Sequence, residues 1–328
     1  MKKLYYATFE KGYDELVKQV IKKLDKNSQI KKLFSDAVLF FADEHFKFEN
    51  TCFKTGNLVI DNLQKEGVGG LNAEMKHLLE KKGLKIVFPR EVKSFKLSFV
   101  KENEKVVIDA NLKKAVEIML RKATKKSISF VSTEAELVLL SKADGTNLFM
   151  KKLYDAQKGS KFAEISSMSE DESYFVNFLS EPAASEVVLD PFAGDGKLIF
   201  ARAKCFKKAN VIANDKQKEN AEDIKKLSKK LKEKSLSVLN YDFLSETFPI
   251  KFIDKIVTNL TDLTYDRSFR ANEFYTEFFD KLFELKVKIA VVVASKSHDL
   301  SRFVQGKFDI DREIVLKRYN VYKLTLKK

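Results

Sequence analysis

The stretch Val187–Gly196, which reads VVLDPFAGDG, decides the fold of the C-terminal part of the chain. A short apolar run ends at Asp190, and Gly194 and Gly196 then stand on either side of Asp195. This pattern is typical of a buried parallel strand that meets a tight glycine turn and opens a helix. Open sheets of this kind bind ligands at the carboxyl ends of their strands. We therefore expect a ligand-binding loop here.

The acids of this loop restrict the kind of ligand. Asp190 and Asp195 place negative charge where a pyrophosphate would need bare backbone N–H donors. Ile199 stands where the dinucleotide-binding motif G-x-G-x-x-G has its third glycine. The loop therefore predicts a cationic ligand without phosphates. S-adenosylmethionine, with its sulfonium and ammonium groups, meets both requirements.

Two further acids follow predicted strands downstream. Asp215 ends the run VIAND, and a carboxylate there can accept both hydroxyls of an adenosine ribose. A simple turn would explain the same residue. Asp242 can accept from an adenine amino group, with Tyr241 or Phe243 as a ring wall. A helix N-cap explains Asp242 nearly as well.

Four segments of different character follow one another along the chain. Residues 1–65 are typical of a small α+β domain, and residues 66–155 repeat that pattern. A polar, serine-rich linker with a short apolar helix spans residues 156–184. In residues 185–328 strands alternate with helices, which predicts a Rossmann-like α/β sheet of seven strands, the last one antiparallel. The predicted strands are 187–190, 211–215, 236–239, 255–259, 289–294, 308–316 and 319–326.

The charge of the chain favours an anionic partner. Its 328 residues carry a formal net charge of +14, and the pI is about 9.4. Nucleic acid is the first candidate partner and a membrane surface the second, although a lysine-rich surface can serve solubility alone. A predicted amphipathic helix gathers Lys114, Arg121 and Lys125 on its polar side. We expect this side either to contact RNA phosphates or to be an ordinary solvated face.

The remaining composition predicts a cytoplasmic protein without a metal site. Cys52 and Cys205 are far apart and form no CxxC pair, which gives no support to zinc and suits a reducing cytosol. The basic N-terminus lacks the apolar core of a signal peptide. No apolar run approaches the length of about 18 residues that a membrane span needs.

Taken in order, these residues resemble the class I S-adenosylmethionine-dependent methyltransferases over roughly Glu186–Lys328. DPFAGDG resembles the DPFxGxG loop of the RNA-guanine and DNA-adenine amino-methyltransferases. The run Asp254–Asn259, DKIVTN, resembles the strand that precedes their catalytic loop, commonly DxIVTNPPY. The basic front end resembles the ferredoxin-like plus THUMP arrangement of THUMP-containing RNA methyltransferases, with residues 110–153 the most THUMP-like. The candidate cofactor residues are Asp190, Pro191, Phe192, Gly194, Gly196, Asp215, Asp242 and Phe243.

The resemblance also implies a mechanism. The oxygen of Asn259 and a neighbouring backbone carbonyl would accept the N–H groups of an exocyclic base amine, and an aromatic residue would stack on a base taken out of its helix. The sequence departs from the motif, because Leu260, Thr261 and Asp262 stand where Pro-Pro-Tyr is expected. Asp262 could supply an acceptor and Tyr265 the stacking ring, or both could belong to a plain surface loop.

The resemblance therefore predicts an RNA methyltransferase that modifies guanine N2, with tRNA ahead of rRNA as its substrate. A protein that binds RNA or S-adenosylmethionine without turnover is one alternative, because the loop after Asn259 is altered. A DNA adenine methyltransferase is another, although the THUMP-like front end favours RNA.

Overall fold

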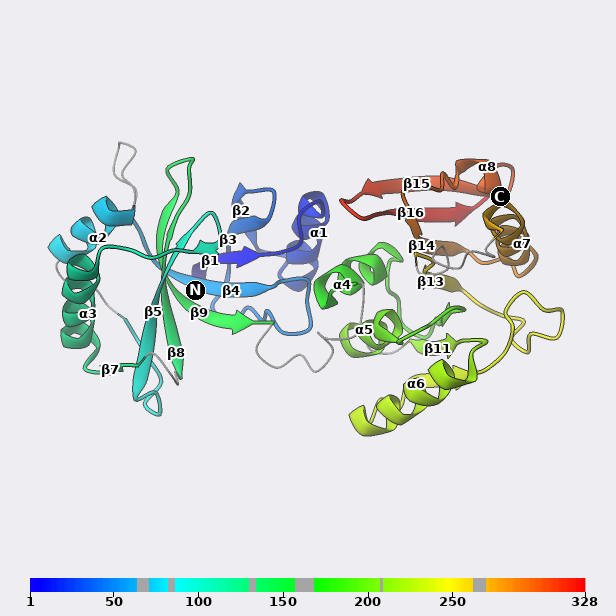
Figure 1. Cartoon of the computed structure of the whole chain (residues 1–328), viewed down its shortest axis with the longest axis horizontal. Coiled ribbons are helices and arrows are strands. Elements are labelled where there is room, and N and C mark those ends of the chain that lie inside the picture. Colours follow the sequence, from blue (N-terminus) through cyan, green and yellow to red (C-terminus); the bar gives the residue numbers. More distant parts are fainter. Residues whose placement is uncertain are drawn as a thin grey trace. The chain divides into compact units, whose positions relative to one another are not determined.

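The computed structural model divides the chain into two compact units (Figure 1). The N-terminal unit contains Met1–Thr8, Ile21–Phe48 and Lys54–Ala156. The C-terminal unit contains Phe9–Val20, Glu49–Phe53 and Gln157–Lys328. The structure describes residues 1–63, 71–81, 86–129, 134–156, 168–206, 209–261 and 270–327.

The N-terminal unit is built on one sheet, in which the described residues form nine strands. These strands are β1 (Lys2–Thr8), β2 (Gln29–Leu33), β3 (Ala37–Asp43), β4 (Thr55–Asn62), β5 (Ser94–Lys101), β6 (Glu104–Lys105), β7 (Ser127–Ile128), β8 (Ala135–Ser141) and β9 (Asn147–Asp155). Their order is β2-β3-β1-β4-β9-β8-β5-β6, and β7 pairs with β5. The antiparallel pair β4–β9 joins strands from the predicted segments 1–65 and 66–155 in one sheet. The division into two domains at residue 65, and their ferredoxin-like and THUMP-like character, stay predictions.

Two helices cover part of this sheet. Met75 of α2 (Leu71–Glu80) and Leu120 of α3 (Ala110–Thr124) are fully buried in one apolar cluster with Phe95 of β5. α3 begins after Asp109, whose side chain accepts a hydrogen bond from the backbone N–H of Leu112 at 2.8 Å. Because its apolar side packs on the sheet, the opposite side of α3 lies in solvent. A further helix, α1 (Asp14–Leu24), has residues in both units.

The C-terminal unit contains the predicted seven-stranded sheet. Its order is β12-β11-β10-β13-β14-β16-β15, and β16 runs antiparallel to both of its neighbours, which confirms the predicted fold class. β10, in the middle of the sheet, is followed in the chain by β11 on one side, while β13 lies on the other, so the strand order reverses there. The strands are β10 (Val187–Asp190), β11 (Asn210–Asn214), β12 (Leu236–Leu239), β13 (Lys255–Asn259), β14 (Ile289–Ser295), β15 (Phe308–Val315) and β16 (Tyr319–Leu326).

Helices separate the strands of this sheet and bury its apolar side chains. Phe278 of α7 packs with Ile256 of β13 and Val292 of β14 in one core cluster. In the same unit, Tyr13 stacks on Phe175 with ring centroids 4.3 Å apart. Residues from the start of the chain therefore contribute to the core of the C-terminal unit. The described helices are α4 (Glu170–Leu179), α5 (Lys197–Cys205), α6 (Lys218–Leu231), α7 (Ala271–Glu284) and α8 (Ser301–Val304).

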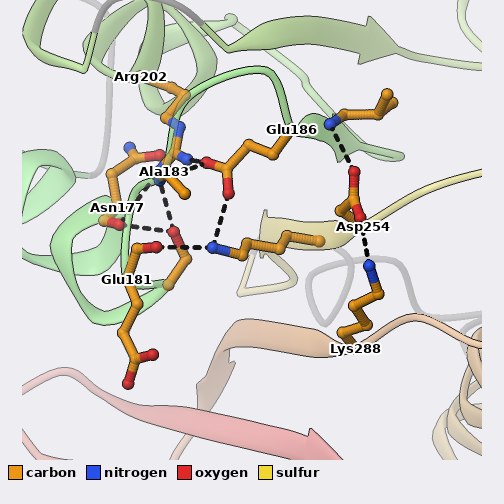
Figure 2. A network of polar contacts seen from close by, with 10 residues as sticks. Asn177, Glu181, Ala183, Glu186, Arg202, Asp254 and Lys288 are labelled. Carbon is orange, nitrogen blue, oxygen red and sulfur yellow. Dashed lines mark hydrogen bonds and ion pairs between the residues drawn. The ribbon is translucent and has the colours of Figure 1, made fainter.

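A buried network of charges joins the starts of β10 and β13 (Figure 2). The fully buried Arg202 forms an ion pair with Glu186, and Nζ of Lys255 lies 2.6 Å from the same carboxylate. Asp254 accepts from the backbone N–H of Val187 at 3.0 Å. Burial lowers the pKa of Lys255 to about 8 and that of Arg202 to about 10. Removing one member of such a network leaves an uncompensated buried charge, so the network fixes the amino end of the sheet.

Candidate functional site

The loop after β10 closes onto the end of β11. The backbone N–H of Ala193 donates to the carbonyl oxygen of Asn214 at 2.9 Å. The N–H of Gly194 donates to Oδ2 of Asp215 at 2.8 Å. These bonds bring the predicted cofactor loop and the predicted ribose carboxylate together at the carboxyl edge of the sheet. This edge, at the point where the strand order reverses, is where open α/β sheets bind their ligands.

The two glycines of the loop serve different purposes. Both have a positive φ, +52° at Gly194 and +77° at Gly196. A Cβ on Gly196 would lie 2.9 Å from Cγ1 of Ile224 and 3.0 Å from the ring of Phe200, so this glycine allows the loop to pack against α5 and α6. A Cβ on Gly194 would meet no described atom within 4 Å. The backbone at Gly194 therefore borders open space that a ligand can fill.

Asp215 retains acceptor capacity beside this loop. Its side chain is largely buried, and Oδ1 accepts from the N–H of Gln217 at 2.8 Å while Oδ2 accepts from Gly194. A carboxylate has about four acceptor positions, so the two backbone bonds leave room for ribose hydroxyls. The bonds also hold the carboxylate in one orientation. The side chain therefore loses less conformational entropy when a ligand binds.

Two asparagines that sequence reasoning missed brace the strand ends. The fully buried Asn214 donates through Nδ2 to the carbonyl oxygens of Pro191 and Tyr241, each at 3.0 Å, and accepts from the N–H of Tyr241 at 3.1 Å. Asn240 donates to the carbonyl oxygen of Asp215 at 2.8 Å. Together they connect the carboxyl ends of β10, β11 and β12. Their only sequence signal is a polar residue next to each predicted acid.

The residues after β12 agree with the prediction in part. Asp242 is exposed, and its Oδ1 accepts from the N–H of Leu244 at 3.0 Å in a local turn. Among the described residues no helix lies between β12 and β13, so Asp242 is not the helix N-cap of the alternative interpretation. The prediction names Tyr241 or Phe243 as the ring wall. Phe243 is only 1% exposed, because it packs in the core in edge contact with Phe192 and Phe248. Tyr241 is the exposed aromatic at this place.

Asp190 connects the cofactor loop to β13. Its buried carboxylate accepts from Oγ1 of Thr258 at 2.7 Å and from the N–H of Phe192 at 3.2 Å. Burial raises the pKa of Asp190 to about 7, and the negative charges of Asp215 and Asp195 act in the same direction. Asp190 therefore links two strands at the switch point, and its charge state is sensitive to pH near neutrality.

The predicted catalytic residues are only partly described. Asn259 is half-buried and ends β13, directly after Thr258. Its side-chain oxygen accepts from the N–H of Thr261 at 3.1 Å and from the hydroxyl of Thr261 at 2.8 Å. Asp262 and Tyr265 lie outside the described residues, so their roles stay predictions. The bonds from Thr261 to Asn259 have no counterpart in a motif with proline at that position, because proline has no N–H.

The predicted RNA-binding side chains lie in the N-terminal unit. Lys114 and Arg121 are exposed on α3, and Lys125 is exposed at its C-cap. Their exposure agrees with phosphate contact and equally with a solvated face. Within the described ranges, no group of acidic, histidine and cysteine side chains could hold a metal ion. No described helix has both the length and the apolar character of a membrane span.

No protein-family model matches the chain, and no curated protein shows a significant match. Solved structures do match. TrmN from Thermus thermophilus superposes with a TM-score of 0.74 at 14% identity, over 100% of both chains. A Listeria monocytogenes protein described as a predicted N6-adenine-specific DNA methylase gives a TM-score of 0.65 at 12% identity, over 98% of this chain and 96% of that one. SMU.472, a proposed methyltransferase complexed with SAH, gives 0.70 at 11% identity, over 100% and 99%.

Because these identities are only 11–14%, the similarity establishes the fold alone. A THUMP domain and a guanine-N2 specificity stay predictions from the sequence. Over its whole length, the chain has a fold shared with solved structures that are described as methylases and methyltransferases.

Proposed function

We propose that the chain is an S-adenosylmethionine-dependent methyltransferase that acts on RNA. One observation carries the proposal: the acidic glycine loop after β10 closes onto Asp215 at the edge where the strand order reverses. Ligands of open α/β sheets bind at this edge. The fold match to SMU.472, which was solved with SAH, supports the same cofactor.

The residues at this edge fit S-adenosylmethionine. Gly194 borders open space, and the carboxylate of Asp215, held by two backbone N–H groups, would accept from the ribose hydroxyls. Asp242 is exposed after β12, and its carboxylate, which accepts one local backbone N–H, would accept from the adenine amino group. Asp195, which is exposed in the loop, favours a cationic ligand. When bound, the cofactor would supply a methyl group activated by its sulfonium.

RNA is the proposed substrate for two reasons. The formal net charge of +14 favours a polyanion. The exposed basic side of α3, with Lys114, Arg121 and Lys125, offers phosphate contacts in the N-terminal unit. The sequence resemblance adds guanine N2 in tRNA as the first target and rRNA as the second. The two free cysteines favour the cytoplasm as the compartment. Orientation of the base would be the main contribution of the protein to the reaction.

A second candidate function is supported by the altered loop. The backbone N–H and the hydroxyl of Thr261 both donate to the oxygen of Asn259, the atom that the resemblance assigns to the substrate amine. A protein that binds S-adenosylmethionine and RNA without turnover would tolerate this arrangement. DNA adenine methylation is a third candidate, supported by the description of the Listeria structure.

One experiment separates these functions. The purified chain is incubated with total RNA, or with DNA, and S-adenosylmethionine labelled in its methyl group, and the product is digested to nucleosides. We expect a labelled methylguanosine from RNA. Labelled methyladenosine from DNA would support the third candidate. Cofactor binding without any labelled nucleoside would support the binding protein and contradict the enzyme.

A further inference from the structure

The loop after β13 is held by hydrogen bonds that a double proline could not make. The backbone N–H of Leu260 donates to the carbonyl oxygen of Val293 at 2.8 Å, one residue beyond the β13 strand. The Leu260 side chain is fully buried in the core of the C-terminal unit. A proline at this position would lack the N–H. Asn259, the last residue of β13 and the neighbour of this anchor, therefore has a defined place at the carboxyl end of the strand.

The bonds from Thr261 fix the orientation of the Asn259 amide. A backbone N–H can only donate, so the side-chain atom 3.1 Å from the N–H of Thr261 must be the amide oxygen. The hydroxyl of Thr261 donates to the same oxygen at 2.8 Å. A carbonyl oxygen has two lone pairs, and Thr261 occupies both.

The group that Asn259 can offer to a ligand is therefore a donor. Its Nδ2 carries two N–H groups, and Nδ2 has no hydrogen-bond partner in the part of the chain that the structure describes. The residue is half-buried at the switch point, next to Thr258 and its bond to Asp190. A half-buried Nδ2 that has no partner among the described residues favours a ligand that brings an acceptor.

Bases with an exocyclic amine bring such an acceptor. In guanine, the carbon that carries N2 also carries N3, a ring nitrogen with a free lone pair. In adenine, the carbon that carries N6 is bonded to N1, which is a ring nitrogen of the same kind. A donor directed at this ring nitrogen would place the amine beside it without contacting the amine.

We propose that Asn259 binds the substrate base as a hydrogen-bond donor to the ring nitrogen next to the amine, and that Thr261 is the positioning residue that turns its amide. The inference rests on the proposed function, because it concerns the same site. It differs from the mechanism that the resemblance implies, in which the oxygen of Asn259 accepts from the amine.

The test compares two variants with a matched control. Asn259→Asp keeps the acceptor for Thr261 and replaces the donor by a second oxygen. Thr261→Val removes the hydroxyl and keeps the backbone N–H. Asn272→Asp is the control, because Asn272 is exposed on α7 and its oxygen, which accepts from Arg302 at 2.6 Å, is preserved. Methylation of total RNA gives kcat and KM for each, and calorimetry gives the affinity for S-adenosylmethionine.

We expect Asn259→Asp to lower kcat/KM by about 100-fold, because an acceptor then faces an acceptor. Acidification should partly restore this variant, because a protonated carboxyl can donate, and a merely structural role would not produce this recovery. Thr261→Val should lower kcat about fivefold, the loss of one hydrogen bond. The control and all cofactor affinities should stay within about twofold of the unchanged protein.

Two results would overturn the inference alone: an Asn259→Asp variant within about threefold of the unchanged protein, or a Thr261→Val variant that is as fast as that protein or faster. Either result would show that an oxygen at position 259 accepts from the amine: the carboxylate oxygen of Asn259→Asp in the first case, and the Asn259 oxygen released by Thr261→Val in the second. Bound cofactor without any methylated nucleoside in the unchanged protein would overturn the proposed function, and this inference with it.

Discussion

Replacing Asp190 by Asn should stabilise the C-terminal unit, and the gain should grow with pH. The folded chain keeps this buried carboxyl protonated up to about pH 7, whereas its ordinary pKa in an unfolded chain is 3.8. The stability that the protonated group provides is therefore lost progressively as the pH rises from 3.8 to about 7, and it stays lost above that. Asparagine resembles the protonated acid and keeps an oxygen for Thr258 and Phe192.

The size of the effect follows from the two pKa values. They differ by about 3 pH units, and each unit corresponds to about 1.4 kcal/mol, so the full gain is about 4 kcal/mol above pH 7. At about pH 5 the gain should be less than half of that. Urea unfolding followed by circular dichroism, at about pH 5 and about pH 8.5, measures the difference between Asp190→Asn and the unchanged chain.

Asp242→Asn is the matched control, because its carboxylate is exposed in the same unit, accepts one backbone N–H, from Leu244 at 3.0 Å, and is not among the charges that raise the pKa of Asp190. We expect the gain of Asp190→Asn at the higher pH to exceed that of this control. A stability difference for Asp190→Asn that is the same at both pH values would refute the assignment of a raised pKa to Asp190. So would a variant that is less stable than the unchanged chain at the higher pH.

Three further changes test the loop, the buried network and the basic helix. Gly196→Ala should lower the free energy of unfolding by at least about 1–2 kcal/mol, because its φ is +77° and the added Cβ would lie 2.9 Å from a side chain; urea unfolding measures this. Arg202→Ala should lower the same quantity by about 3 kcal/mol, because it removes one of the two cations that pair with the buried Glu186 carboxylate and empties a fully buried position. Reversing the charges of Lys114, Arg121 and Lys125 together should weaken RNA binding and flatten its dependence on salt in filter binding.

The glycine change has a matched control, and each of the three changes has a result that would contradict the expectation. Gly306→Ala shares a φ of +78° but meets no described atom within 4 Å, so it measures the backbone contribution alone. Equal losses for the two glycine changes would mean that contact with Ile224 does not matter. An Arg202→Ala variant of unchanged stability would contradict the role of the network. An unchanged salt dependence after charge reversal would leave α3 as an ordinary solvated face.

The sequence predicts the sheet well because its signals are local. The apolar runs, the acids that end them and the positive-φ glycines are each visible within a few residues, and the observed β11, Asn210–Asn214, differs from its predicted range by one residue at each end. The acid at Asp215 could be placed at a strand end for the same reason. Local patterns therefore predict which residues reach the carboxyl edge of the sheet.

The contacts between strand ends could not be predicted in this way. The role of Asn214 depends on where Pro191 and Tyr241 meet in space, and the burial of Phe243 depends on its neighbours in the core. The bond from Thr261 to Asn259 had a weak local signal, since asparagine often accepts from the N–H two residues onward.

The most direct test of cofactor binding is calorimetric titration of S-adenosylmethionine into the intact chain and into Asp215→Ala. We predict saturable binding at one site per chain, and loss of that binding when the carboxylate that holds the loop, and that we propose binds the ribose, is removed. Circular dichroism checks that the variant is folded. Absence of binding by the unchanged chain would contradict the proposed cofactor site, and so would an Asp215→Ala variant that binds with unchanged affinity.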